Sequence, residues 1–350
     1  MNLRLLKDIP KNELLDKKIL FRVDFEVPIK NGQVEEGFRI KATLPTFEYL
    51  LSAGTKILIL TKRGHPKTFR DPELSVGLLI PYLEKLLKIK IGLIKEFSEL
   101  EIFRQSKNGS IFIFENLRFW PEEEASDEKF AQKLAEAGDL YISDNFGTAH
   151  RAHASVAILP KLLPSHAGFL LEKEVESLEK IMNGAQKPVV AILGGAKLET
   201  KLPLIERFLK NGSSVLVAGK LANTILIAKG LKMSESCADT ESFQYIKDLD
   251  LNSSGLHWPV DGVVAKDLNS KERWTSLEEI SPLNTLAADE CVLDMGPATV
   301  GGFTAILRSA KTIFWNGPVG VCEDERFAKG TMELARSISR ISAFKVLGGG

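Results

Sequence analysis

The sequence of 350 residues predicts an α/β protein with two doubly wound parallel sheets, and three observations indicate this fold class. Short β-branched, apolar runs recur along the chain, with helical patterns between them. These runs are apolar almost throughout rather than alternating, as expected for strands that are covered on both faces of a parallel sheet. One amphipathic segment stands between two series of such runs and divides the chain into two halves.

Eight apolar runs are predicted to be strands. They are residues 19–27, 56–60, 111–114 and 140–143 in the first half, and residues 188–193, 214–217, 262–265 and 312–315 in the second. Between them, residues 74–87 and 127–137 show the apolar spacing of helices. Ser126 or Asp127 is placed to cap the second helix.

Residues 168–183 are predicted to form the helix that joins the halves. One face carries the apolar residues Leu171, Val175, Leu178 and Ile181, and Asn183-Gly184 supplies a stop. We therefore expect an N-terminal domain over residues 1–171, an interdomain helix over 172–186 and a C-terminal domain over 187–350. Two Rossmann-like domains of this kind are expected to face a cleft, with ligands at the carboxyl ends of the strands.

The composition indicates no strongly charged partner. The 46 lysines and arginines offset 46 aspartates and glutamates, so no net charge favours nucleic acid or an anionic membrane. No apolar run is long enough to span a bilayer. The three cysteines, Cys237, Cys291 and Cys322, are odd in number and lack metal-ligand spacing. A reducing cytoplasm is the simplest interpretation.

Glycine and positive charge coincide at the end of the strongest predicted strand of the second half. Gly194 and Gly195 are followed by Lys197 and Lys201. Glycines let backbone N–H groups approach a phosphate, and the two lysines lie one helical turn apart. Neither the P-loop pattern nor the dinucleotide fingerprint is present. From these residues alone, an ordinary strand-to-helix turn is as good an interpretation as a phosphate site.

Basic residues follow the predicted strands of the first half. They are Arg22, Arg39, Lys62, Arg63, Arg118 and Arg151. Several of them converging on one place would bind a small polyanion. Solvated arginines and surface ion pairs are the alternative. His150 and His153 lack a nearby set of carboxylates, so they do not predict a metal site.

Several segments, in this order, resemble the phosphoglycerate kinases from about residue 5 to the last residue. The segments are Arg22–Phe25, Glu115–Phe119, Asp144–Ser155, Gly194–Leu202, Trp315–Glu323, Phe327–Thr331 and Gly348–Gly350. The third reads Asp-Asn-Phe-Gly-Thr-Ala-His-Arg-Ala-His-Ala-Ser and is long and highly specific. The resemblance implies reversible phosphoryl transfer between ATP and 3-phosphoglycerate in glycolysis or gluconeogenesis, giving 1,3-bisphosphoglycerate and ADP.

The resemblance also implies the site residues. The acceptor would be bound by Asp24, Phe25, Glu26, Arg39, Lys62, Arg63, His65, Arg118 and Arg151. The nucleotide would be bound by Gly195, Lys197, Lys201, Gly219, Asn316, Glu323, Gly348, Gly349 and Gly350. Arg39 and Lys201 would act in catalysis, and no general base is needed because the acceptor is already a carboxylate. Mg²⁺ would accompany ATP or ADP, and the protein is expected to be a monomer in the cytoplasm.

The chain departs from the family pattern mainly in the acceptor site. Glu26 stands where the family has asparagine, Lys62 where it has histidine, His65 where it has arginine, and Trp120 where it has histidine. We expect the Glu26 carboxylate to repel an anionic acceptor, and His65 to lack the planar fork of arginine. In the nucleotide half, Ala218 and Lys220 replace two glycines. Lys220 would disturb that segment if it requires a positive φ or a close approach to adenine.

The end of the sequence departs as well. The family continues beyond the glycine run that ends at Gly350, first with the aspartate of its nucleotide–magnesium site. No metal ligand is therefore predicted within the chain, and we expect a fragment or a truncated record. Two alternatives remain open. One is a catalytically impaired phosphoglycerate kinase-like protein that binds nucleotide, and the other is a kinase for a different small carboxylate.

Overall fold

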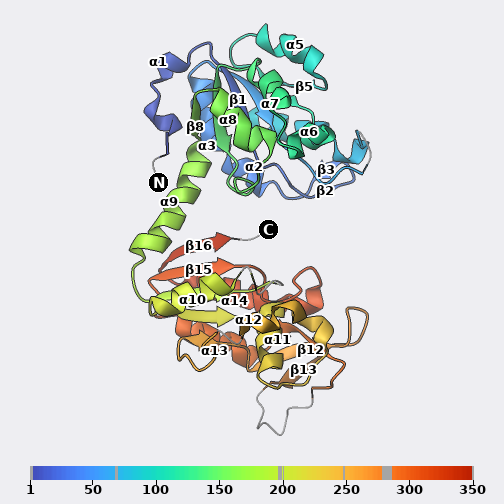
Figure 1. Ribbon diagram of the computed structural model, residues 1–350, viewed down its shortest axis with the longest axis vertical. Coiled ribbons are helices and arrows are strands. Elements are labelled where there is room, and N and C mark those ends of the chain that lie inside the picture. The colour runs from blue at the N-terminus through green and yellow to red at the C-terminus, as the bar shows by residue number, and fades with distance from the viewer. Residues whose placement is uncertain are drawn as a thin grey trace. The chain divides into compact units, whose positions relative to one another are not determined.

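The computed structural model describes residues 3–67, 70–195, 199, 201–246, 249–277 and 286–348 (Figure 1). The chain separates into two compact units, Met1–Glu176 and Ser177–Gly350, and each has a parallel sheet of its own. The boundary falls within the helix predicted to join the halves, which is α9 (Phe169–Gly184). The predicted fold class is confirmed. Among the described residues, no helix is both long enough and apolar enough to cross a membrane.

The N-terminal unit contains a six-stranded parallel sheet with the order β5-β6-β4-β1-β7-β8. Its strands are β1 (Lys18–Val23), β4 (Lys56–Leu60), β5 (Ile91–Ile94), β6 (Ile111–Phe114), β7 (Leu140–Asp144) and β8 (Ser165–Ala167). The prediction for residues 19–27 was too long, because the chain leaves the sheet after Val23 and the Phe25 N–H donates to Thr61 Oγ1. The short edge strands β5 and β8 were not predicted.

Alternate residues of β1 explain its continuous apolar character. Ile19 and Phe21 pack in one buried cluster, and Leu20 packs in another on the opposite face of the sheet. The first cluster includes side chains of α3 (Leu44–Ser52) and α4 (Ile80–Leu87). The second includes side chains of α5 (Leu100–Arg104), α7 (Glu128–Ala135) and α8 (Leu159–Leu162). Both faces are therefore covered, as the sequence predicted.

The two predicted helices of this unit are present with altered ends. Residues 74–87 form a 3₁₀ turn, Val76–Leu79, followed by α4, because Ser75 caps the turn by accepting from the Gly77 N–H. Asp127 is the cap of α7, with Oδ1 accepting from the Phe130 N–H at 2.7 Å. Further short elements are α1 (Lys11–Leu14), α2 (Phe38–Ala42), α6 (Pro121–Glu124) and a hairpin of β2 (Ile29–Lys30) and β3 (Gln33–Val34).

The C-terminal unit contains a five-stranded parallel sheet with the order β11-β10-β9-β15-β16. Its strands are β9 (Val189–Leu193), β10 (Ser214–Val217), β11 (Leu256–His257), β15 (Thr312–Asn316) and β16 (Phe344–Gly348). Side chains of α10 (Leu202–Lys210), α11 (Gly219–Ala228) and α12 (Phe243–Ile246) pack on one face. Side chains of α13 (Pro297–Leu307) and α14 (Lys329–Arg340) pack on the other.

One strand prediction was wrong in its setting. Residues 262–265 were expected in the parallel sheet, but β12 (Asp261–Ala265) is the centre of a separate antiparallel sheet with β13 (Arg273–Ser276) and β14 (Cys291–Met295). Val264 and Val292 of this sheet share a buried cluster with Leu226 of α11. A strand that is buried on both faces is apolar whether it runs parallel or antiparallel to its neighbours. The apolar pattern therefore does not distinguish a parallel sheet from an antiparallel one.

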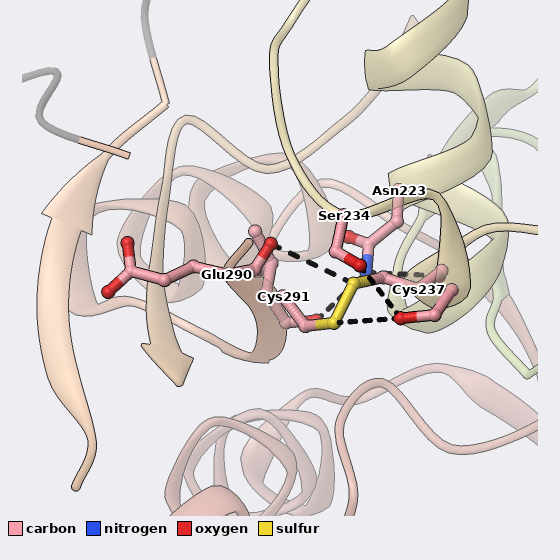
Figure 2. The surroundings of a disulfide bond; sticks show 7 residues. Asn223, Ser234, Cys237, Glu290 and Cys291 are labelled. Atoms are coloured by element: carbon pink, nitrogen blue, oxygen red, sulfur yellow. Dashed lines mark hydrogen bonds between the residues drawn. A yellow bond between two sulfur atoms is a disulfide. The ribbon is translucent and has the colours of Figure 1, made fainter. Parts of the chain in front are cut away.

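A disulfide joins Cys237 to Cys291 at the end of this small sheet (Figure 2). Both cysteines are buried in the same apolar cluster, and their Cα atoms lie 5.5 Å apart. Asn223 Nδ2 donates to the carbonyls of Cys237 and Val292, which holds α11 against the bridge. Cys322 is exposed and has a free thiol. The three cysteines predicted a reducing compartment, where such bridges are uncommon.

Candidate functional site

The predicted acceptor residues of the N-terminal unit gather where β1, β4 and β6 end. Asp24 follows β1, and its Oδ2 pairs with Nη1 of Arg39 on α2 at 2.8 Å. The loop after β7 passes the same carboxylate, because a β-carbon at Gly147 would lie 3.2 Å from Asp24 Oδ2. The motif that carries the family resemblance most strongly therefore lies beside Asp24.

Lys62 and Glu26 contact each other in this cluster. Lys62 Nζ donates to Glu26 Oε2 at 2.6 Å and lies 3.9 Å from Asp24 Oδ1. Glu26 also accepts from the Gly64 N–H, at 2.9 Å to Oε1 and 3.2 Å to Oε2. The Glu26 carboxylate is thus paired with a cation and bonded to the backbone, and is not an isolated charge.

Arg118 reaches the same loop from the end of β6. Its Nη1 donates to the Gly64 carbonyl at 2.7 Å and lies 3.4 Å from His65 Nε2. Its Nε forms an ion pair with Glu124 of α6 at 2.8 Å. Arg39, Lys62 and Arg118 therefore converge, which the sequence alone did not establish.

Three predicted acceptor residues lie differently. The Arg63 Nη1 donates to the carbonyls of Glu73 and Ser75, so this guanidinium is bonded to backbone. Phe25 is fully buried in the core of the unit. Arg151 is exposed, and its guanidinium makes no hydrogen bond or ion pair with the described part of the chain.

Sequence reasoning did not assign a role to Asn116, which joins the loops that carry these residues. Its Oδ1 accepts from the N–H groups of Arg63 and Arg118, at 3.0 and 3.1 Å. Its Nδ2 donates to the carbonyls of Arg63 and Leu74, at 2.7 and 3.0 Å. The side chain is completely buried. The signal was available in the segment Glu115–Phe119, where a polar residue directly follows a buried strand.

The predicted nucleotide residues of the C-terminal unit also lie close together. The Gly195 N–H donates to the Pro318 carbonyl at 3.0 Å, and the Gly317 N–H donates to the Gly348 carbonyl at 3.3 Å. A β-carbon at Gly194 would lie 1.9 Å from the Pro318 carbonyl oxygen, so this close approach requires glycine. The carboxyl ends of β9, β15 and β16 therefore pack against one another.

Two of these residues have side-chain or backbone features that suit a ligand. Asn316 Oδ1 is buried without a hydrogen-bond partner among the described residues. Gly219 has φ +64°, directly after β10, and a β-carbon there would lie 3.2 Å from the Pro318 carbonyl oxygen. A buried acceptor without a partner is a position that a bound ligand can satisfy.

Lys201 stands at the start of α10, and burial lowers the pKa of its ammonium group. Glu323 is exposed in the loop after β15. The Val321 N–H donates to the Leu293 carbonyl at 2.9 Å, which anchors that loop to β14. Lys197, Gly349 and Gly350, which were also predicted, lie outside the described residues.

Comparison with known proteins decides the family. The family model described as phosphoglycerate kinase matches residues 6–350. This chain belongs to the phosphoglycerate kinase family. The phosphoglycerate kinase of Thermomicrobium roseum is 36% identical over 355 residues, which cover 99% of this chain and 89% of that protein.

Solved structures agree with this assignment. A phosphoglycerate kinase from Pyrococcus horikoshii has a TM-score of 0.87 and 32% identity, covering 99% of this chain and 89% of that chain. One from Coxiella burnetii has a TM-score of 0.79 and 32% identity, covering 100% of this chain and 88% of that chain. The similarity extends over both units of this member of the family.

The departures from the phosphoglycerate kinase pattern in the nucleotide half lie at ordinary backbone positions. Ala218 is extended, with φ −150°, and Lys220 belongs to the first turn of α11. Of the three positions, Gly219 has a positive φ, and Gly219 is the glycine that this chain retains. The backbone conformation at Lys220 therefore does not require glycine.

Trp120, which replaces a histidine of the phosphoglycerate kinase pattern, is part of the core. Its ring stacks on Phe114 with centroids 4.9 Å apart and also contacts Phe97 and Phe130.

Among the described residues, no group of three or more His, Cys, Asp or Glu side chains lies together as a metal site would require.

Proposed function

We propose that this protein catalyses reversible phosphoryl transfer between ATP and 3-phosphoglycerate, giving ADP and 1,3-bisphosphoglycerate. The observation that carries the proposal is the convergence of Arg39, Lys62 and Arg118 at the carboxyl ends of β1, β4 and β6. A small polyanion is the ligand that such a cluster of cations suits best. Family membership over almost the whole chain supports the same acceptor.

In this proposal the N-terminal unit holds the acceptor. Lys62, Arg118 and the exposed Arg151 bind its anionic groups, and Asp24 orients Arg39 through their ion pair. Arg39 offsets negative charge on the transferring phosphoryl group. No residue removes a proton, since the attacking group is a carboxylate, and catalysis consists of positioning and charge stabilisation.

The C-terminal unit holds the nucleotide. Gly195, Gly219 and Gly348 let the backbone approach it closely, Asn316 and Glu323 contribute polar contacts, and Lys201 with Lys197 contacts the phosphates. Mg²⁺ accompanies the nucleotide, where it neutralises phosphate charge, and we assign no described residue to it. We further propose that the protein acts as a cytoplasmic monomer without nucleic-acid or membrane partners, in keeping with its balanced charge.

The test measures ADP formation from ATP, Mg²⁺ and 3-phosphoglycerate. We expect Arg39→Ala and Lys201→Ala to lower kcat/KM by about 10²-fold or more, because each removes a cation that stabilises transition-state charge. Lys41→Ala on α2 and Lys210→Ala on α10 are matched controls that remove an exposed charge from the same helices. A folded wild-type protein that turns over no faster than Arg39→Ala would refute the proposal.

His65 favours a second candidate, a kinase for a different small carboxylate. It lies 3.4 Å from Arg118 and stands where the family has an arginine, whereas Lys62 adds a cation where the family has a histidine, so the positive charge of the loop is placed differently. Assays with a series of short carboxylates that carry their negative charges at other positions separate the two functions. A higher kcat/KM for any of them than for 3-phosphoglycerate would favour this candidate.

A further inference from the structure

Glu26 and Lys62 form a pair that is more enclosed than a surface ion pair. The Lys62 side chain is 11% exposed and that of Glu26 is 35% exposed. Burial by itself raises the pKa of Glu26, but the hydrogen bonds from Lys62 and Gly64 and the charges of Lys62 and Arg118 outweigh it, so the pKa is lowered. The carboxylate is therefore ionised at neutral pH and is stabilised by the cation beside it.

The Gly64 peptide connects this pair to Arg118. Gly64 has φ +55°, and this left-handed conformation directs its N–H to Glu26 and its carbonyl to Arg118 Nη1. One residue therefore receives a hydrogen bond on its carbonyl side from the arginine and gives one on its amide side to the carboxylate. Gly64 thus connects the Glu26 carboxylate to Arg118 through a single residue.

The third contact of the pair leads to Arg39. Lys62 Nζ lies 3.9 Å from Asp24 Oδ1, and the other oxygen of that carboxylate pairs with Arg39. Glu26 and Asp24 thus stand on two sides of Lys62 and restrict where its ammonium group can lie. An ammonium group has three donors, and one of those of Lys62 is bonded to Glu26 among the described residues.

We propose that Glu26 and Lys62 act as one specificity-determining unit of the acceptor site. Lys62 binds an anionic group of the acceptor, and Glu26 is a positioning residue that holds Lys62 directly and Arg118 through Gly64. The inference rests on the proposed function and goes beyond it, because it assigns a joint role to two of the residues in which this chain departs from its family. Glu26 then contributes to acceptor binding although it carries the same sign of charge as the acceptor.

A double-mutant cycle tests the pair. Glu26→Gln keeps an oxygen for the Gly64 N–H and removes the charge, and Lys62→Met removes the ammonium group at similar length. We expect Lys62→Met to raise KM for 3-phosphoglycerate about 100-fold, because the acceptor then faces an unpaired carboxylate. The double variant should show a rise of only about tenfold, so the second change rescues the first. KM for ATP should stay constant throughout.

Controls separate this role from a merely structural one. Lys62→Arg keeps a cation for Glu26 and should stay within about threefold of wild type. The exposed pair Lys90–Glu84, at 2.8 Å in the same unit, is the matched control, and Lys90→Met should leave both KM values unchanged. If Lys62→Met does not fold, Lys62→Gln takes its place in the cycle.

The outcomes are distinct. Additive effects, or a double variant no better than Lys62→Met, would overturn the coupling while wild-type turnover upholds the proposed function. Equal changes in KM for ATP and for 3-phosphoglycerate would also overturn it, because they indicate a general loss of structure. A wild-type protein without turnover of 3-phosphoglycerate refutes the proposed function itself, before any variant is compared.

Discussion

Removal of the Cys237–Cys291 disulfide is expected to lower the stability of the C-terminal unit substantially. The bridge closes a segment with a sequence separation of 54 residues. The chain-entropy relation for a loop of this length gives about 4 kcal/mol at 25 °C, mostly from restriction of the unfolded chain. For a unit of this size, that free energy corresponds to a decrease in Tm of about 10 °C.

Loss of the disulfide is expected to lower the free energy of unfolding of the C-terminal unit without changing its fold. Both cysteines are buried with Leu226, Met233 and Val264. Reduced thiols pack as small apolar groups, so the cluster remains filled when the bond is absent. Cys237→Ala combined with Cys291→Ala adds a small cavity to the lost constraint, so it should destabilise the unit slightly more than reduction does.

Thermal unfolding by tryptophan fluorescence, with and without reductant, measures the effect. Trp258, Trp274 and Trp315 lie in the C-terminal unit and Trp120 in the other, so the signal reports mainly on the C-terminal unit. Cys322→Ser is the control, because that thiol is exposed and unbridged. Three titratable thiols in the unreduced, denatured protein, or an unchanged Tm on reduction, would refute the reasoning.

Three further predictions concern other parts of the chain. Gly219→Ala should raise KM for ATP but not for 3-phosphoglycerate, because it strains a position with φ +64° beside the Pro318 carbonyl. Gly212→Ala is the control: Gly212 has φ +70° and open space around it, so this change should affect only stability. Steady-state kinetics distinguish the two variants. Burial raises the pKa of Asp144 to about 6, so this group stabilises the fold below its ordinary pKa of 3.8 and loses that contribution as the pH rises through about 6. Asp144→Asn should flatten the pH dependence of the unfolding free energy over that range by on the order of 3 kcal/mol, and equal slopes in urea titrations would contradict this. Trp120→His should cost about 2 kcal/mol of stability by removing the stack on Phe114, without lowering KM for 3-phosphoglycerate; a lower KM would show that the family's histidine acts directly on the acceptor.

Sequence reasoning succeeded where burial alone determines the pattern. The strands at residues 56–60, 111–114 and 214–217 were predicted with their observed ends, because each consists mainly of consecutive apolar residues. It failed for β12, since strand direction depends on the partner strands rather than on the strand itself. It also missed β8, whose three residues include Ser165 and His166.

The sequence predicted which residues belong to the candidate site but not the contacts between them. Motifs identified Glu26, Lys62 and Arg118 one at a time, and each was judged by its own charge. The ion pair of Glu26 and Lys62 joins residues separated by 36 positions, and the peptide that links them to Arg118 is invisible in a pattern. The repulsion expected at Glu26 was predicted from the sign of its charge alone, without the cation of Lys62 that pairs with it.

Asn116 has a consequence for how this surface can diversify. Its amide uses two acceptor and two donor directions on the backbone of neighbouring loops, and an aspartate there would turn a carboxylate oxygen toward two carbonyls. Almost no other residue can therefore replace Asn116. Lys62 and His65 lie on the same loops, but they do not take part in the hydrogen bonds of Asn116. Replacement of an exposed residue such as His65 can therefore change the charge of these loops without breaking the hydrogen bonds that Asn116 makes between them.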